Sequence, residues 1–122
     1  MNDRTLAVSH HVTSEGFHVV AVAGDLDHHT APELGRAIDR ALASPAHGLI
    51  IDLSRLAYCD STGISVLIDA YRDTDAAKAP FGLAAVTPNL ADMLAILGLD
   101  RFLSIYPSVH QAIEVFTHPT RT

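Results

Sequence analysis

Lysine is almost missing from this sequence, and the shortage limits what the protein can bind. Lys78 is the only lysine, and eight basic side chains against fourteen acidic ones leave a formal net charge of -6. A nucleic-acid surface needs many cations to displace the counterions of phosphate, and the sequence has no cluster of Lys and Arg. The composition argues against direct DNA or RNA binding and suits a soluble protein whose partners are proteins.

Cysteine and long apolar runs are equally scarce. Cys59 is the only cysteine, so no internal disulfide can form, and no CxxC or CxxH grouping offers metal ligands. The N-terminus leads into no signal-type apolar core, and no apolar run approaches the ~20 residues needed to span a bilayer. We therefore expect a cytoplasmic protein that is neither secreted nor inserted into a membrane.

The remaining composition is that of a folded globular chain. Hydrophobic residues make up 48% and charged residues 18% of the 122 positions, and there is no internal repeat or low-complexity linker. A chain of this size can bury a substantial core without disulfides or metals. We expect one domain over residues 1–122, with its core at about 5–116 and a loose polar tail at 117–122.

Apolar segments alternate between strand and helix patterns along the chain. Helices are predicted to begin at Thr30, near Ser61, at Thr87 and at Ser108, each followed by apolar residues at helical spacing. Thr30 and Ser108 each have a Glu or Gln three residues later, which is the capping-box pattern. We expect a loop at 54–60 and strands at 5–11, 17–23, 49–53, 81–86 and 103–106. This order predicts an α/β fold with a mainly parallel sheet and one antiparallel hairpin at its start.

Ser61 is the residue of most chemical interest. It lies where a buried strand is followed by a loop and then a helix, and a helix N-terminus can accommodate a phosphate. One interpretation is a regulatory phosphorylation site, and the other is a simple N-cap. A phosphate beside Asp60 would add roughly -1.5 to -2 charges and could act as an off switch for a protein interface.

Other chemistry finds little support in the sequence. Ser61 lacks the G-x-S-x-G context of a nucleophile elbow, no histidine has a spacing that implicates it as a general base, and there is no Gly-rich phosphate loop. Asp25 and Asp27 follow a strand and could accept hydrogen bonds from a partner. The adjacent His28 and His29 are more typical of solvated side chains than of metal ligands. We therefore predict no enzyme activity, no metal and no cofactor.

Two short motifs together resemble a known family. Through Gly24-Asp25-Leu26-Asp27…Thr30-Ala31…Leu34 and Asp52-Leu53-Ser54…Asp60-Ser61-Thr62-Gly63-Ile64…Leu67, the chain resembles the STAS-domain anti-sigma factor antagonists of bacteria. The resemblance covers nearly the whole chain, from about Val8 to Phe116. Asp25 departs from the pattern, because many members have Glu there. The resemblance implies the STAS fold, in which four to five strands form a mixed, mainly parallel sheet and about four helices pack mostly on one face.

The resemblance also implies a function. Family members bind an anti-sigma factor, often a serine kinase, and so release a sigma factor that directs RNA polymerase. The kinase phosphorylates the serine that corresponds to Ser61, which abolishes the complex, and a phosphatase reverses this step. The residues then expected to contact the partner are Asp25, Asp27, His28, Thr30, Asp60, Ser61, Thr62 and Gly63.

Two other functions stay open at this stage. The same domain serves as an accessory subunit of lipid-type ABC transporters, where no phosphate cycle operates. It could also be a small-ligand or nucleotide-binding module, which predicts stabilisation by that ligand.

Overall fold

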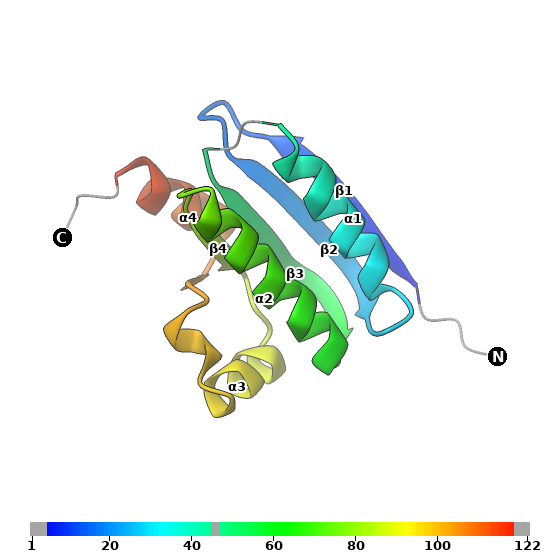
Figure 1. Cartoon of the computed structure of the whole chain (residues 1–122). Helices are drawn as coiled ribbons and strands as arrows, with labels where there is room; N and C mark the ends of the chain where they lie inside the picture. Colours follow the sequence, from blue (N-terminus) through cyan, green and yellow to red (C-terminus); the bar gives the residue numbers. More distant parts are fainter. Residues whose placement is uncertain (1–4, 45–46, 119–122) are drawn as a thin grey trace.

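The computed structural model describes residues 5–44 and 47–118, in which a five-stranded sheet carries four α-helices (Figure 1). The strands lie side by side in chain order and are β1 (Leu6–Val12), β2 (His18–Leu26), β3 (Leu49–Cys59), β4 (Phe81–Ala84) and β5 (Ile105–Tyr106). β1 pairs antiparallel with β2, and every other pair is parallel. The helices are α1 (Ala31–Leu42), α2 (Ser61–Ala76), α3 (Pro88–Ile96) and α4 (Val109–Thr117), with a 3₁₀ turn η1 (Leu99–Arg101) after α3. The predicted mixed, mainly parallel sheet is confirmed.

The helices are divided unequally between the two faces of the sheet. α1, α2 and α3 share one core with the sheet, here called the major core. Leu34, Leu67 and Leu94 are fully buried in it. A smaller cluster forms on the other face beneath α4. Consecutive residues of β3 serve the two clusters: Ile51 belongs to the larger and Ile50 to the smaller. The run at the start of β3 is therefore continuously apolar because both of its faces are covered there.

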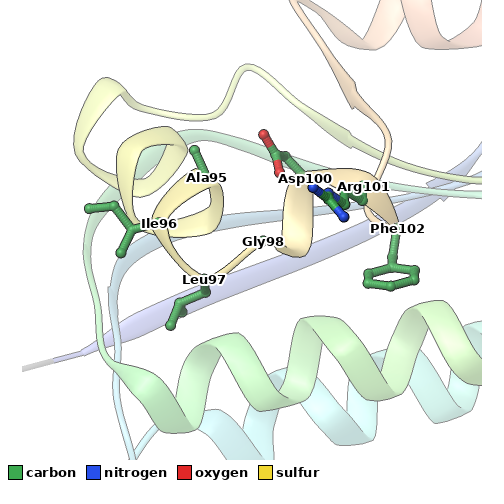
Figure 2. A pocket seen from close by; sticks show the side chains of 7 residues that line it. All are labelled: Ala95, Ile96, Leu97, Gly98, Asp100, Arg101 and Phe102. Atoms are coloured by element: carbon green, nitrogen blue, oxygen red, sulfur yellow. The ribbon is translucent and has the colours of Figure 1, made fainter.

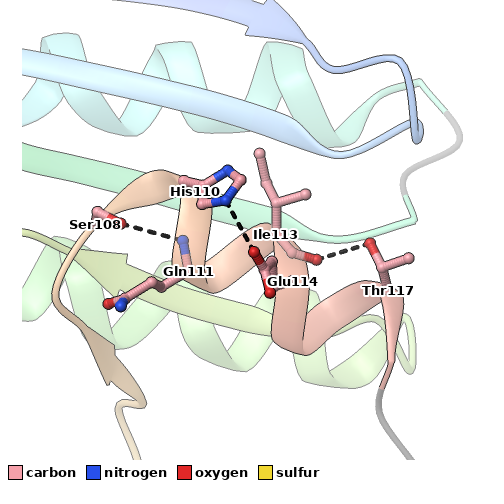
Figure 3. A network of polar contacts seen from close by, with 6 residues as sticks. All are labelled: Ser108, His110, Gln111, Ile113, Glu114 and Thr117. Carbon is pink, nitrogen blue, oxygen red and sulfur yellow. Dashed lines mark hydrogen bonds and ion pairs between the residues drawn. The ribbon is translucent and has the colours of Figure 1, made fainter.

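α4 packs on this second face, here called the minor face, and Phe116 makes its aromatic contacts there. Phe116 packs edge-on against Phe17, with ring centroids 5.3 Å apart, and against Tyr106 at 5.9 Å. Ser108 caps this helix, since its hydroxyl accepts a hydrogen bond from the Gln111 N–H at 3.1 Å, as the sequence predicted (Figure 3). Three of the four helices thus pack on one side and the fourth on the other.

The predicted loop at 54–60 is wrong, because β3 continues to Cys59. The extension pairs with the end of β2, where Arg55 lies opposite Ala23 and Cys59 lies opposite Leu26. Ser54 and Arg55 are exposed, since the helices leave this part of the minor face uncovered. Their polarity gave the segment the appearance of a loop. The register shifts between β2 and β3 at Ala21/Ala23 and Gly24/Asp25 also interrupt the alternation of buried and exposed residues that marks a strand.

Two other predicted strands are too long. β4 stops at Ala84 instead of residue 86, because Ala85 adopts a left-handed backbone with φ of 57°. β5 comprises only Ile105 and Tyr106 rather than 103–106. Leu103 is instead buried in the major core just before the strand.

Parts of two sequence predictions fall outside the described residues. The expected loose tail at 117–122 is described only to residue 118, and Thr117 is the last residue of α4. The sequence also predicts that Ser44-Pro45 ends the helix that begins at Thr30, and Pro45 lies outside the described residues. Among the described helices, none combines the length and apolar character required to cross a membrane.

Candidate functional site

The two sequence motifs meet at the carboxyl ends of β2 and β3. These strands are parallel neighbours, so the residues that follow them emerge at the same edge of the sheet. Asp25 lies opposite Tyr58 in the register, and the Asp60 N–H donates to the Leu26 carbonyl at 3.1 Å. The β2–α1 loop (residues 27–30) and the start of α2 therefore lie side by side, although some 30 residues separate them in the sequence.

Asp60, and not Ser61, is the N-cap of α2. Its backbone is extended, and its carboxylate Oδ1 accepts a hydrogen bond from the Gly63 N–H at 3.0 Å. Ser61 is the first helical residue and is exposed. The interpretation of Ser61 as a cap is therefore wrong, because the preceding carboxylate already occupies that role. The Ser61 hydroxyl is left at the surface, at the positive end of the helix dipole.

Gly63 is buried at a close contact beneath this turn. A Cβ atom there would lie 2.7 Å from Leu26 Cγ and 2.8 Å from Cys59 Sγ. Only glycine allows the first turn of α2 to approach the ends of β2 and β3 this closely. Gly63 therefore sets the position of the exposed Ser61 and Thr62.

The β2–α1 loop is held by an internal hydrogen-bond network. The Thr30 hydroxyl donates to the Asp25 carbonyl at 2.7 Å and accepts from the Asp27 N–H at 2.9 Å. The Asp27 carboxylate accepts from the backbone N–H groups of His29 and Thr30 at 2.9 and 3.1 Å. These bonds satisfy backbone groups that the turn would otherwise leave buried without partners.

Two predictions about this loop are corrected by that network. The Thr30 side chain makes no N-cap hydrogen bond to α1, so the predicted capping box is not formed. Asp27 and Thr30 are only 2% and 4% exposed, so they do not offer a partner a direct contact in this conformation. Their side chains shape the loop instead, because both are short polar groups that favour local bonds to backbone.

Asp25 and His28 are the predicted loop residues that reach the surface. Asp25 is partly exposed and its N–H donates to the Thr5 carbonyl at 2.9 Å. Gly24 makes that approach possible, since its φ is +109° and a Cβ would lie 2.4 Å from the Thr5 oxygen. His28 is exposed and its ring lies 4.0 Å from that of His29. No cluster of three or more potential metal ligands occurs in the described part of the chain.

The single thiol lies next to the site but is poorly reactive. Burial raises the pKa of Cys59 to about 11, and the neighbouring Asp60 carboxylate acts in the same direction. Cys59 packs against the major core, and its Sγ lies 3.5 Å from the Asp60 carbonyl. A thiol with this pKa stays protonated at neutral pH, which supports a packing role.

An apolar cavity adjoins the start of α2, and sequence reasoning missed it. It has a volume of about 470 Å³ and is lined by Leu56, Ala57, Tyr58, Cys59, Thr87, Asn89, Leu90 and Met93. Tyr58 and Met93 are exposed large side chains at its wall. The only sequence signal was the apolar flank before Ser61. The other wall comes from α3, some 30 residues later, which only the fold could bring alongside.

A second exposed apolar surface lies farther along α3 and η1. Ile96, Leu97 and Phe102 are 83%, 57% and 60% exposed and line a hollow around Gly98. Figure 2 shows the Leu97 and Phe102 side chains both directed toward the neighbouring helix, while Ile96 points away from the turn. Apolar side chains this exposed are typical of surfaces that contact other macromolecules.

Comparison with known proteins agrees with this geometry. Residues 10–112 match the model of the STAS domain family. The chain is 28% identical over 109 residues to the anti-sigma-F factor antagonist RsfB of Mycobacterium tuberculosis, covering 89% of this chain and 86% of RsfB. It is 25% identical over 109 residues to an anti-sigma F factor antagonist of Paenibacillus polymyxa, covering 88% and 91% of the two chains.

A solved structure gives the same result for the fold. An anti-sigma factor antagonist from Mycobacterium paratuberculosis superposes with a TM-score of 0.84 at 28% identity, over 95% of this chain and 97% of that one. The chain belongs to the STAS domain family.

Proposed function

We propose that this protein is an anti-sigma factor antagonist that binds its anti-sigma factor through the surface around Ser61 and is released from it by phosphorylation of Ser61. The relatives named above are anti-sigma factor antagonists. The observation that carries the proposal is the placement of Ser61: an exposed hydroxyl at the first position of α2, with the capping role taken by Asp60.

This placement lets a kinase reach the hydroxyl without unfolding the helix. The Ser61 side chain is exposed, and the helix turn below it is fixed by the bond from Gly63 to Asp60. A phosphate at the first turn lies at the favourable end of the helix dipole, so the fold tolerates it. The modification would therefore alter the surface and leave the domain intact.

The surroundings give that added charge a large effect on binding. Asp60 and the partly exposed Asp25 already make this edge of the sheet acidic. A partner that accepts a neutral hydroxyl beside them must desolvate or repel a phosphate, and a pair of unit charges near a surface at ~4 Å is worth about 4 kcal/mol. Even half of that penalty weakens binding by more than about tenfold, and the whole of it by several hundredfold.

The apolar cavity beside Ser61 supplies the attractive part of such an interface. Its walls carry the exposed Tyr58 and Met93, and it adjoins the end of β3 immediately before Asp60. Interface energy is concentrated in apolar and aromatic anchors, whereas charged groups near them control specificity. An anti-sigma factor of the serine-kinase type would place an apolar side chain here and its active site over Ser61, and a phosphatase would restore binding.

The test is a binding measurement on four forms of the protein with a kinase-type anti-sigma factor. Wild type and Ser61→Ala should bind it, and Ser61→Asp should lose at least about tenfold in affinity. Ser65→Asp is the matched control, because Ser65 is exposed one turn farther along α2. With ATP, intact mass should increase by one phosphate in wild type and not in Ser61→Ala. Equal affinity of Ser61→Asp and Ser65→Asp, or phosphate on Ser61→Ala, would refute the proposal.

A further inference from the structure

Two histidines join the first two strands at a distance from Ser61. His10 of β1 and His18 of β2 lie on the face that carries the major core. Each is two residues from a core valine of its own strand, Val8 and Val20, so it points to the same side. His10 Nε2 and His18 Nδ1 are 2.8 Å apart, and the two rings are stacked with centroids 5.0 Å apart. His18 is 3% exposed, while His10 lies at the surface.

The second ring nitrogen of His18, Nε2, determines which tautomers of the two histidines are favoured. His18 Nε2 is buried and has no hydrogen-bond partner among the described residues. If His18 carried its proton there, a buried N–H would lack an acceptor, which is the costlier kind of unsatisfied group. The geometry therefore favours a neutral His18 with its proton on Nδ1, donating to Nε2 of His10. The proton of His10 then sits on its own Nδ1.

A second proton on His10 breaks this arrangement. Both Nε2 of His10 and Nδ1 of His18 would then carry hydrogens at 2.8 Å, unless the His18 proton moved to the buried Nε2. The titratable or charged groups that act on His10 are also all basic side chains: His18 from β2, His11 from β1, and Arg40 from the last turn of α1. Burial is the largest cause that lowers the pKa of His10, and these three groups lower it further.

We infer that His10 and His18 form a proton-sensitive latch that fastens the edge strand β1 to the rest of the sheet. Among the strands of the described residues, β1 has only β2 as a neighbour. Its attachment therefore depends on that one ladder, on the core beneath it and on this side-chain bond. The consequence reaches the other end of β1, where the Thr5 carbonyl accepts the Asp25 N–H. Release of β1 would therefore also free the entry to the β2–α1 loop.

The direction of the pH effect follows from the lowered pKa of His10. The unfolded chain takes up this proton first as the pH falls below the ordinary value of 6.5. The stabilisation is complete above that pH and is lost as the pH falls from there toward the lower pKa of the folded state. Mild acid should loosen β1 before the rest of the fold.

The first test separates this pair from the other histidines. His10→Gln keeps an acceptor for the His18 proton but cannot titrate. His118→Gln is the control, because His118 is exposed after α4 and is not among the groups that lower the pKa of His10. Between about pH 7.5 and about pH 5.5, the fall in Tm should be clearly smaller for His10→Gln than for wild type and His118→Gln. Equal falls in all three proteins would overturn the inference.

The second test does not depend on stability. Long-range ¹H–¹⁵N correlation at neutral pH should show the His18 proton on Nδ1, and hydrogen exchange should show the β1 amides and the Asp25 amide losing protection in mild acid, after correction for intrinsic rates. A proton on Nε2 of His18, or acid-insensitive protection of β1, would contradict the latch.

Discussion

Asp60 and Ser61 are adjacent, yet they have separate tasks. The Asp60 carboxylate holds the first turn of α2 through the Gly63 N–H, and this leaves Ser61 with no structural duty for its side chain that the hydrogen-bond pattern shows. A residue that must change its charge is best placed where the fold does not depend on it. Because Asp60 caps the helix, the side chain of Ser61 could be modified without loss of that hydrogen bond.

Replacing Asp60 should show that this carboxylate stabilises the helix start. Asp60→Ala removes the acceptor for the Gly63 N–H, and N-cap losses of this kind typically cost ~1 kcal/mol in the free energy of unfolding. Asp60→Asn is the matched control, since an amide oxygen can cap equally well. Denaturant unfolding measures both. A loss in Asn as large as in Ala would show that the charge, and not the cap, is what matters.

At the scale of elements, the β2–α1 loop is a small rigid unit. The Thr30 hydroxyl spans it by bonding both the Asp25 carbonyl and the Asp27 N–H, and the Asp27 carboxylate closes it from the other side. The loop can therefore present Asp25 and His28 in a fixed geometry next to α2. The acidic motif combines the partly exposed Asp25 with the buried Asp27.

Removing the Thr30 hydroxyl should destabilise this loop measurably. Thr30→Val preserves the shape of the side chain but leaves the buried Asp27 N–H and the Asp25 carbonyl without the hydroxyl. Each buried group that loses its partner typically costs ~1–3 kcal/mol in the free energy of unfolding. Thr30→Ser keeps the hydroxyl and should cost less. The free energies of unfolding of the two variants give the comparison, and a Val variant as stable as the Ser variant would contradict the role assigned to the hydroxyl.

For the whole molecule, the fold separates the site from the rest of the structure. The major core lies under α1, α2 and α3, whereas α4 has its own cluster on the opposite face. Ser61 lies at the exposed start of α2, where added charge meets solvent and the helix dipole instead of the core. Under the proposed function, phosphorylation of Ser61 would change which partner can dock and would leave the domain folded in both states.

A phosphate mimic at Ser61 should change partner binding and leave the stability of the domain close to that of wild type. Ser61→Asp should change the free energy of unfolding by no more than about 0.5 kcal/mol, the usual range for an exposed substitution. In amide NMR spectra its shifts should be confined to the first turn of α2 and the adjoining β2–α1 loop. Shifts spread through β4 or α4 would show that the charge acts through the whole fold, contrary to this account.

The sequence by itself determined the alternation of elements, the start of α2 at Ser61 and the two motifs at the ends of β2 and β3. Helical spacing and short apolar runs are local signals, and parallel neighbouring strands place their ends together by topology alone. Even the capping at Ser108 was legible from four residues.

Tertiary structure alone decided which polar side chains of the two motifs reach the surface. Asp27 and Thr30 look exposed in sequence but are buried, because the loop folds back on them. β3 looked finished at residue 53 but continues, because the helices cover only part of one face. The cavity beside Ser61 and the pairing of His10 with His18 join residues distant in the chain, and burial and hydrogen bonding at such contacts are set by neighbours that a linear pattern does not contain.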